Sequence, residues 1–245
     1  MGSLNDALVV DMAKAVHYHL SYINTIARAE VLAESCFRLP AIEYIERHPN
    51  IGFTVFLEHP HLIYKYRRID LSWAKKGFEF PTTFLEMKYV KGETADKAEQ
   101  QRFYNDLARQ TAILLYKKDV KCFFMASGLS VNWDNCFVNS YVPVENAANV
   151  MTTTAKNGRK KVNKQKIKSI YHKWFSFDIQ NPGRVFAIKN DTAYHNVFLN
   201  EYKQKMDIPA ILFKRIRTRL LWISNPVDSL NFDGGNMTGI WEVRR

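Results

Sequence analysis

Cysteine and long apolar runs are both scarce in this chain of 245 residues. The three cysteines, Cys36, Cys122 and Cys136, are odd in number and widely spaced, and none forms a Cys-x-x-Cys pair. Neither a disulfide framework nor a cysteine zinc site is therefore encoded. The longest apolar runs, 112–116 and 122–126, fall far short of the roughly 18 residues that a membrane-spanning helix needs. We expect reduced thiols, a cytoplasmic location and no membrane partner.

Glycine and proline are also few, at 10 and 8 residues, which excludes fibrous proteins and argues against disorder. Apolar residues make up 47% of the chain and aromatic residues 13%, which favours a packed interior. At a soft prior of about 150 residues per domain, the length suits one elaborated domain or a core with an appended subdomain. We expect a folded globule that needs no disulfides.

Acidic residues are fewer than basic ones: the chain has 24 Asp and Glu and 35 Lys and Arg, which gives a net charge of +11. Between Glu145 and Asp178 there is no acidic residue at all. Such an excess implies an anionic partner, of which nucleic acid is the commonest, although composition alone does not separate it from acidic proteins or lipid. The basic residues of this segment are Lys156, Arg159, Lys160, Lys161, Lys164, Lys166, Lys168 and Lys173.

Hydrophobic periodicity predicts an α/β core in the first half of the chain. Apolar residues at three- and four-residue steps are typical of amphipathic helices, and runs of β-branched and aromatic residues are typical of strands. Pro40 is tolerated in a first turn, so we expect it to limit one helix and to begin another. The expected helices are 5–34, 40–47 and 94–118, and the expected strands are 52–58, 61–73, 82–90 and 120–127. The helix between the last two strands makes them candidates for parallel pairing in a mixed sheet.

The second half of the chain has weaker patterns. The stretch 162–175 has a helical spacing that would turn Val162, Ile167 and Ile170 inward and the lysines outward. We divide the chain into a core at 1–130 and a basic C-terminal α+β extension at 131–245, packed on the core as one unit. The remaining expected elements are strands at 136–144, 184–189, 218–224 and 239–245 and a helix at 191–206.

Two carboxylates and a lysine in the expected strands carry the clearest chemical signal. Glu86 and Lys88 lie two residues apart, so on a strand their side chains project from the same face. If a neighbouring strand brings Asp70 beside Glu86, the pair supplies the hard oxygen ligands that Mg²⁺ prefers. Lys88 is then placed to orient or help deprotonate a water for phosphodiester hydrolysis. The alternative is that Glu86 and Lys88 form an exposed ladder pair of opposite charges.

The order Asp70…Glu86-Met87-Lys88 resembles the Asp…Glu-x-Lys signature of the PD-(D/E)xK nuclease superfamily, and the resemblance covers residues 28–128. It implies a restriction-endonuclease-like fold, a mixed central sheet flanked by helices. It also implies Mg²⁺ or Mn²⁺ held by Asp70, Glu86 and the backbone carbonyl of Met87. The catalytic residues it implies are Asp70, Glu86, Lys88 and, on the helix before the metal strands, Glu34.

Three groups of residues are expected to contact nucleic acid. Gln100 and Tyr104 match the Gln-x-x-x-Tyr spacing of RecB-type members, although Tyr104 can instead pack a helix face while Gln100 is simply exposed. The basic segment supplies backbone contacts, unless it is a charged loop that touches nothing. An alternating stretch near the C-terminus fits a strand with its arginines on one face. The cationic candidates are Lys160, Lys161, Lys164, Lys168, Arg215, Arg217 and Arg219.

The resulting expectation is a magnesium-dependent endonuclease that cuts DNA in restriction, phage defence or repair, with a homodimer implied by the resemblance alone. One alternative is a non-catalytic nucleic-acid-binding protein with a nuclease-like fold, in which Asp70 lies too far from Glu86 to share an ion. Another is a protein-interaction module whose basic surface meets an acidic protein.

Overall fold

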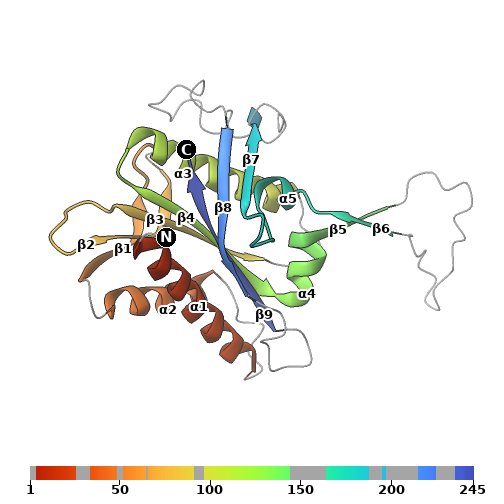
Figure 1. The fold of residues 1–245 in the computed structure, drawn as a ribbon, viewed down its shortest axis with the longest axis horizontal. Coiled ribbons are helices and arrows are strands. Elements are labelled where there is room, and N and C mark those ends of the chain that lie inside the picture. Colours follow the sequence, from red (N-terminus) through yellow and green to blue (C-terminus); the bar gives the residue numbers. More distant parts are fainter. Residues whose placement is uncertain are drawn as a thin grey trace, which may run out of the picture.

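Seven strands form one mixed sheet in the computed structural model, and helices cover both of its faces (Figure 1). The strand order is β1-β2-β3-β4-β9-β8-β7. Only β3 and β4 pair in parallel, whereas the other neighbours are antiparallel. The strands are β1 (Phe53–Pro60), β2 (Arg68–Lys75), β3 (Thr83–Val90), β4 (Lys121–Leu129), β7 (Gly183–Ala187), β8 (Arg215–Ile223) and β9 (Asn236–Arg244). The structure describes residues 4–25, 34–48, 52–64, 66–90, 97–143, 164–187, 195–196, 215–224 and 235–245.

Helices α1 (Leu4–Thr25) and α2 (Ser35–Glu46) cover one face of the sheet, and α3 (Lys97–Tyr116) covers the other. The first face buries a core that includes Val16, Phe37 and Met87. The second buries an aromatic-rich core that includes Phe124 and Trp241. The smaller elements are α4 (Ser130–Asn132), a π-helical turn (Trp133–Val138), α5 (Tyr171–Trp174) and a separate hairpin of β5 (Asn139–Pro143) and β6 (Lys164–Lys168).

The connection from β3 through α3 to β4 positions the functional side chains. Because β3 and β4 are parallel, the chain must cross over between them, and α3 makes that crossover. Along β3, Leu85 and Met87 are buried under α1 and α2, while Phe84 and Val90 are buried under α3. The intervening residues Glu86 and Lys88 therefore face α3, as the period-two pattern predicts.

The α/β class and the mixed sheet flanked by helices are confirmed. Three of the four strands expected in the first half begin and end within two residues of their expected positions, whereas the strand expected at 61–73 begins only at Arg68. The C-terminal segment 131–245 contributes β7, β8 and β9 to this same sheet, with β9 directly beside β4. Arg215, Arg217 and Arg219 lie on one side of β8, as expected, because the intervening residues are buried. Among the described residues, no helix combines the length and the apolar character that crossing a membrane requires.

Two predictions about helices are wrong. Helix α2 begins at Ser35 and runs through Pro40, which is buried inside it, rather than beginning at that proline. Burial of Phe37, Ala41 and Ile45 on the same helix outweighs the hydrogen bond that Pro40 lacks. The segment 162–175 is not one helix, because residues 164–168 pair with β5 as a strand before the short α5. Of the helix expected at 191–206, only the helical residues 195–196 fall within the described part.

Candidate active site

Asp70 and Glu86 meet where β2 and β3 run side by side. Leu71 pairs with Leu85 across these strands, so Asp70 and Glu86 are the next residues along the antiparallel pair. The carboxyl group of Asp70 is close enough to that of Glu86 to disfavour its ionisation. Oδ2 of Asp70 also accepts the backbone N–H of Met87 on β3 at 2.8 Å. The spatial proximity that the sequence could only assume is therefore present.

The Glu86 carboxyl is buried, with its side chain 3% exposed. Burial, and after it the negative charge of Asp70, raise the pKa of Glu86 from 4.5 to about 8 against the opposing charges of Arg109 and Lys88. Its Oε1 has no hydrogen-bond partner and lies 3.9 Å from the Arg109 guanidinium. A buried acid with a strongly shifted pKa beside a second carboxylate is typical of a functional site.

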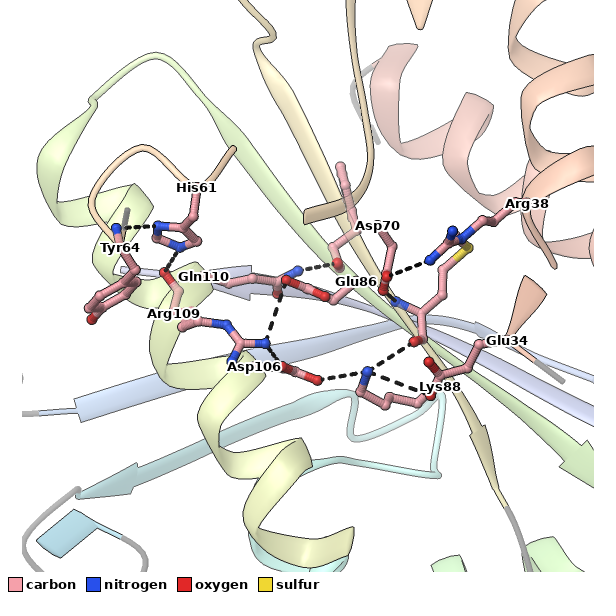
Figure 2. A network of polar contacts seen from close by, with 12 residues as sticks. Glu34, Arg38, His61, Tyr64, Asp70, Glu86, Lys88, Asp106, Arg109 and Gln110 are labelled. Atoms are coloured by element: carbon pink, nitrogen blue, oxygen red, sulfur yellow. Dashed lines mark hydrogen bonds and ion pairs between the residues drawn. The ribbon is translucent and has the colours of Figure 1, made fainter. Parts of the chain in front are cut away.

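Lys88 projects from the same face of β3 as Glu86 and is held from three directions (Figure 2). Its Nζ lies 3.1 Å from Oδ2 of Asp106 and 3.6 Å from Oε1 of Glu34. It also donates to the carbonyl of Met87 at 3.3 Å. Lys88 is therefore a mostly buried, fixed cation at the edge of the carboxylate pair rather than half of an exposed ladder pair. Glu34, which precedes α2, lies close enough to assist it.

Residues of α3 complete the network on the side away from α2 (Figure 2). Asp106 and Arg109 are three positions apart and form a buried ion pair, in which Arg109 lies between Asp106 and Glu86. Gln110 donates from Nε2 to the carbonyl of Phe123 at 2.6 Å, which fixes α3 against β4. The helix thus supplies a negative and a positive side chain to the site from one turn.

A second arginine approaches the site from α2. The Arg38 guanidinium lies 3.4 Å from Oδ1 of Asp70 and also pairs with Glu58 on β1. Glu58 has a φ of 48°. It lies on β1 between Leu57 and His59, which pair with Leu71 and Ile69 of β2. This left-handed backbone is unusual for a residue other than glycine, and the register of β1 against β2 is the same on either side of it.

Sequence reasoning missed Asp106, Arg109 and Arg38, and it gave Glu58 no favoured role. Asp106 and Arg109 lie in an amphipathic helix in which a polar residue reads as solvated, so no local signal distinguished them. A carboxylate and an arginine three residues apart on the helix that follows Glu-x-Lys was the one available hint.

The described residues among those expected to contact nucleic acid lie on three separate elements, α3, β6 and β8. Tyr104 is fully buried with its ring against Trp174, which fits the alternative that it packs a helix face, and Gln100 is partly exposed. Lys160 and Lys161 lie outside the described residues, whereas Lys164 and Lys168 belong to β6. Arg215 and Arg217 are exposed on β8. Arg219 is engaged by Asp6 and Glu242, each at 2.8 Å, and so ties α1 to the sheet.

The donor set fits one hard divalent cation. In the described part of the chain, no group of three or more His, Cys, Asp or Glu side chains is arranged to hold a metal. Mg²⁺, however, is commonly held by one or two carboxylates and completes its shell with waters and substrate phosphates. Asp70 and Glu86 supply the two carboxylates, and the unpartnered Oε1 of Glu86 is an available ligand atom. The Met87 carbonyl, which the resemblance also implies as a ligand, accepts a hydrogen bond from Lys88.

His61 anchors the segment before β2 to α3 and is expected to make the fold acid-sensitive. Its Nδ1 accepts the N–H groups of Ile63 and Tyr64, so the ring is neutral with its proton on Nε2, which faces the carbonyl of Arg109 at 3.3 Å. Burial, and next the charge of Arg109, lower the pKa of His61 from 6.5 to about 3. Between pH 6.5 and about pH 3, His61 is therefore protonated in the unfolded chain but neutral in the folded chain.

As pH falls from 6.5 towards 3, His61 should thus cost about 1.4 kcal/mol of stability per pH unit. Urea unfolding of wild type and His61→Ala at several pH values in this range measures the effect. His61→Ala should be less stable at pH 7 but lose less stability on acidification. His19→Ala, which alters a partly exposed histidine of α1, is the control and should keep the wild-type slope. Equal slopes for wild type and His61→Ala would contradict the assignment.

Comparisons with protein-family models, curated proteins and solved structures give no match for this chain. No activity is therefore carried over from a relative. The resemblance to the nuclease superfamily rests on residues of this sequence alone.

Proposed function

We propose that the protein is a magnesium-dependent nuclease with a restriction-endonuclease-like fold that hydrolyses phosphodiester bonds, most readily of DNA. The observation that carries the proposal is the pair of neighbouring carboxyl groups of Asp70 and Glu86 on adjacent strands, with Lys88 on the same face of β3 as Glu86. Two neighbouring acids at a buried position destabilise each other unless a proton or a cation lies between them. A divalent cation at that position satisfies both.

The chain's own residues divide the work of the reaction. A bound Mg²⁺ would supply a Lewis acid for a phosphate oxygen and lower the pKa of a water ligand. Asp70 and Glu86 would hold it, with Asp70 fixed by the Met87 N–H. Lys88, oriented by Asp106 and Glu34, is placed to hydrogen-bond the attacking water or the non-bridging phosphate oxygen.

A second candidate is a nucleic-acid-binding protein that keeps this arrangement without turnover. The observation that favours it is the pair of arginines already beside the carboxylates, Arg38 at 3.4 Å from Asp70 and Arg109 at 3.9 Å from Glu86. These cations offset part of the negative charge. The proximity of Asp70 and Glu86 argues for the nuclease, because the binding-only alternative expects the two carboxylates to be too far apart to share an ion.

The deciding experiment incubates the purified protein with plasmid and with single-stranded DNA in Mg²⁺, in Mn²⁺ and in a chelator. We expect cleavage with either metal and none with the chelator. Asp70→Ala and Glu86→Ala should each lower the cleavage rate at least about 1,000-fold, since each removes one of two protein ligands.

Glu43→Ala is the matched control, because Glu43 is an exposed carboxylate on α2 that pairs with Arg47 instead of the site. It should cleave like the wild type. Cleavage that survives both Asp70→Ala and Glu86→Ala would falsify the site assignment. Salt-sensitive DNA binding with no metal-dependent cleavage would favour the second candidate.

A further inference from the structure

A basic cavity of about 450 Å³ lies beside the carboxylate site, along the N-terminal half of α3. It shares Lys88, Asp106 and Arg109 with the network described above, so the two places are continuous. Its other charged residues are Arg102 on α3 and Arg67, which comes just before β2. A volume in the range of about 300 to 1,000 Å³ is that of a ligand site rather than a packing defect.

The charge of this cavity selects an anion. Its wall holds four cations, Arg67, Lys88, Arg102 and Arg109, and one carboxylate, Asp106. Asp106 contacts both Lys88 and Arg109, and each of these cations also faces a carboxylate outside the wall, Glu34 for Lys88 and Glu86 for Arg109. The four cations still outnumber these three carboxylates. A net positive charge therefore remains in a concave place, where the surrounding protein concentrates its field.

The geometry of α3 also favours an anionic ligand in this cavity. Ala98, Gln101, Arg102, Asn105 and Arg109 lie at three- and four-residue steps, so one side of α3 forms the wall. Ala98 belongs to the first turn of this 20-residue helix, where the helix dipole favours negative charge. The amides of Gln101 and Asn105 are held to each other by a 2.6 Å hydrogen bond and add polar groups beside the cations. Cations and amides together suit the oxygens of a phosphodiester.

We propose that this cavity binds a phosphate group of the nucleic-acid strand next to the phosphate that is cut, a subsite that rests on the proposed nuclease function. Lys88 is common to both places, so a strand whose scissile phosphate lies at Asp70 and Glu86 passes directly into the cavity. Arg102 and Arg67 then hold the neighbouring phosphate and set the register of the strand. Such contacts supply affinity without reading sequence.

The test measures DNA binding without cleavage. Fluorescence anisotropy with labelled duplex and single-stranded oligonucleotides, in a chelator and over a series of salt concentrations, compares wild type with Arg102→Ala. We expect Arg102→Ala to weaken binding about tenfold at low salt and to reduce the slope of log affinity against log salt by about one. The matched control is Arg68→Ala, which removes an exposed arginine that bonds the Glu58 carbonyl and does not line the cavity.

Equal weakening by Arg102→Ala and Arg68→Ala, or by neither, overturns the proposal. A second arm adds inorganic phosphate and follows the melting temperature. If phosphate stabilises wild type but not Arg102→Ala while DNA affinity is unchanged, the cavity serves a free anion and the strand subsite is wrong. If wild type shows Arg102-dependent binding but no metal-dependent cleavage, the nuclease proposal fails and the phosphate subsite is supported.

Discussion

Glu86→Gln is expected to abolish cleavage and, in a chelator, to make the protein more stable than the wild type. The activity should fall at least about 1,000-fold, because an amide is a poor ligand for Mg²⁺ and carries no charge. The stability should rise because the substitution removes a buried ionisable group that resists ionisation. A substitution that stabilises the protein but abolishes its activity indicates that the original residue serves catalysis at the expense of stability.

The direction of the pH dependence follows from the raised pKa of Glu86. The unfolded chain loses the proton near pH 4.5 and the folded chain near pH 8, so the folded state binds more protons between these values and loses stability as pH rises. At pH 7 the cost is about 3 kcal/mol. The groups that face this carboxyl are Asp70 on β2, Lys88 on β3, Arg109 on α3 and the buried thiol of Cys122 on β4, whose own pKa is raised by burial and by Glu86.

Urea unfolding in a chelator at pH 5 and pH 8 measures the effect. Between pH 5 and pH 8 the stability of Glu86→Gln relative to the wild type should rise by about 3 to 4 kcal/mol, because the uncharged amide does not titrate. Added Mg²⁺ should raise the melting temperature of the wild type and leave that of Glu86→Gln unchanged. Glu43→Gln, on the exposed side of α2, should shift neither quantity. A Glu86→Gln protein that cuts DNA near the wild-type rate would remove Glu86 from the proposed mechanism.

The strands of the site could be predicted from the sequence because the position of a strand and the face on which each side chain lies depend on neighbouring residues. The pleat sends alternate residues of β3 to opposite faces of the sheet, so the common face of Glu86 and Lys88 follows from a spacing of two. The proximity of Asp70 was only assumed from the sequence, and it results from the antiparallel pairing of β2 with β3 that the structure shows. For these three residues, chain order and strand geometry carry nearly all of the arrangement.

The partners of the site could not be predicted, because they come from packing between distant elements. Arg38 reaches Asp70 only because α2 runs through Pro40, which local rules treat as a helix start. Asp106 and Arg109 meet Lys88 and Glu86 only because α3 crosses the sheet at one particular rotation. Periodicity finds the apolar face of such a helix but not which polar residue at its margin is buried.

Loss of the buried Asp106–Arg109 ion pair is the second large effect that we expect from a single substitution. The Asp106 side chain is 3% exposed and contacts both Arg109 and Lys88. Removing it leaves two mostly buried cations without their shared partner, which typically costs about 3 to 5 kcal/mol. Asp106→Leu should therefore unfold at a much lower urea concentration than the wild type. It should also slow cleavage, because Lys88 loses the carboxylate that orients it.

Replacing both members of the pair should recover part of this loss. In Asp106→Leu/Arg109→Met the uncompensated charge of Arg109 is gone and two side chains of comparable size fill the space, so the double variant should be more stable than Asp106→Leu alone. Glu86 loses a neighbouring cation in that variant, but it is already protonated to a large extent at neutral pH, so the added cost is small.

Helix α1 offers the matched control, since Asp11 and Lys14 form an ion pair with the same three-residue spacing but with side chains 49% and 42% exposed. Asp11→Leu and Asp11→Leu/Lys14→Met should each change the free energy of unfolding by less than about 1 kcal/mol. The measurement is urea unfolding of all four variants at pH 7 in a chelator. If the Asp106 and Asp11 series show the same small effects, then burial does not govern the pair on α3, and Lys88 is held mainly by Glu34 and the Met87 carbonyl.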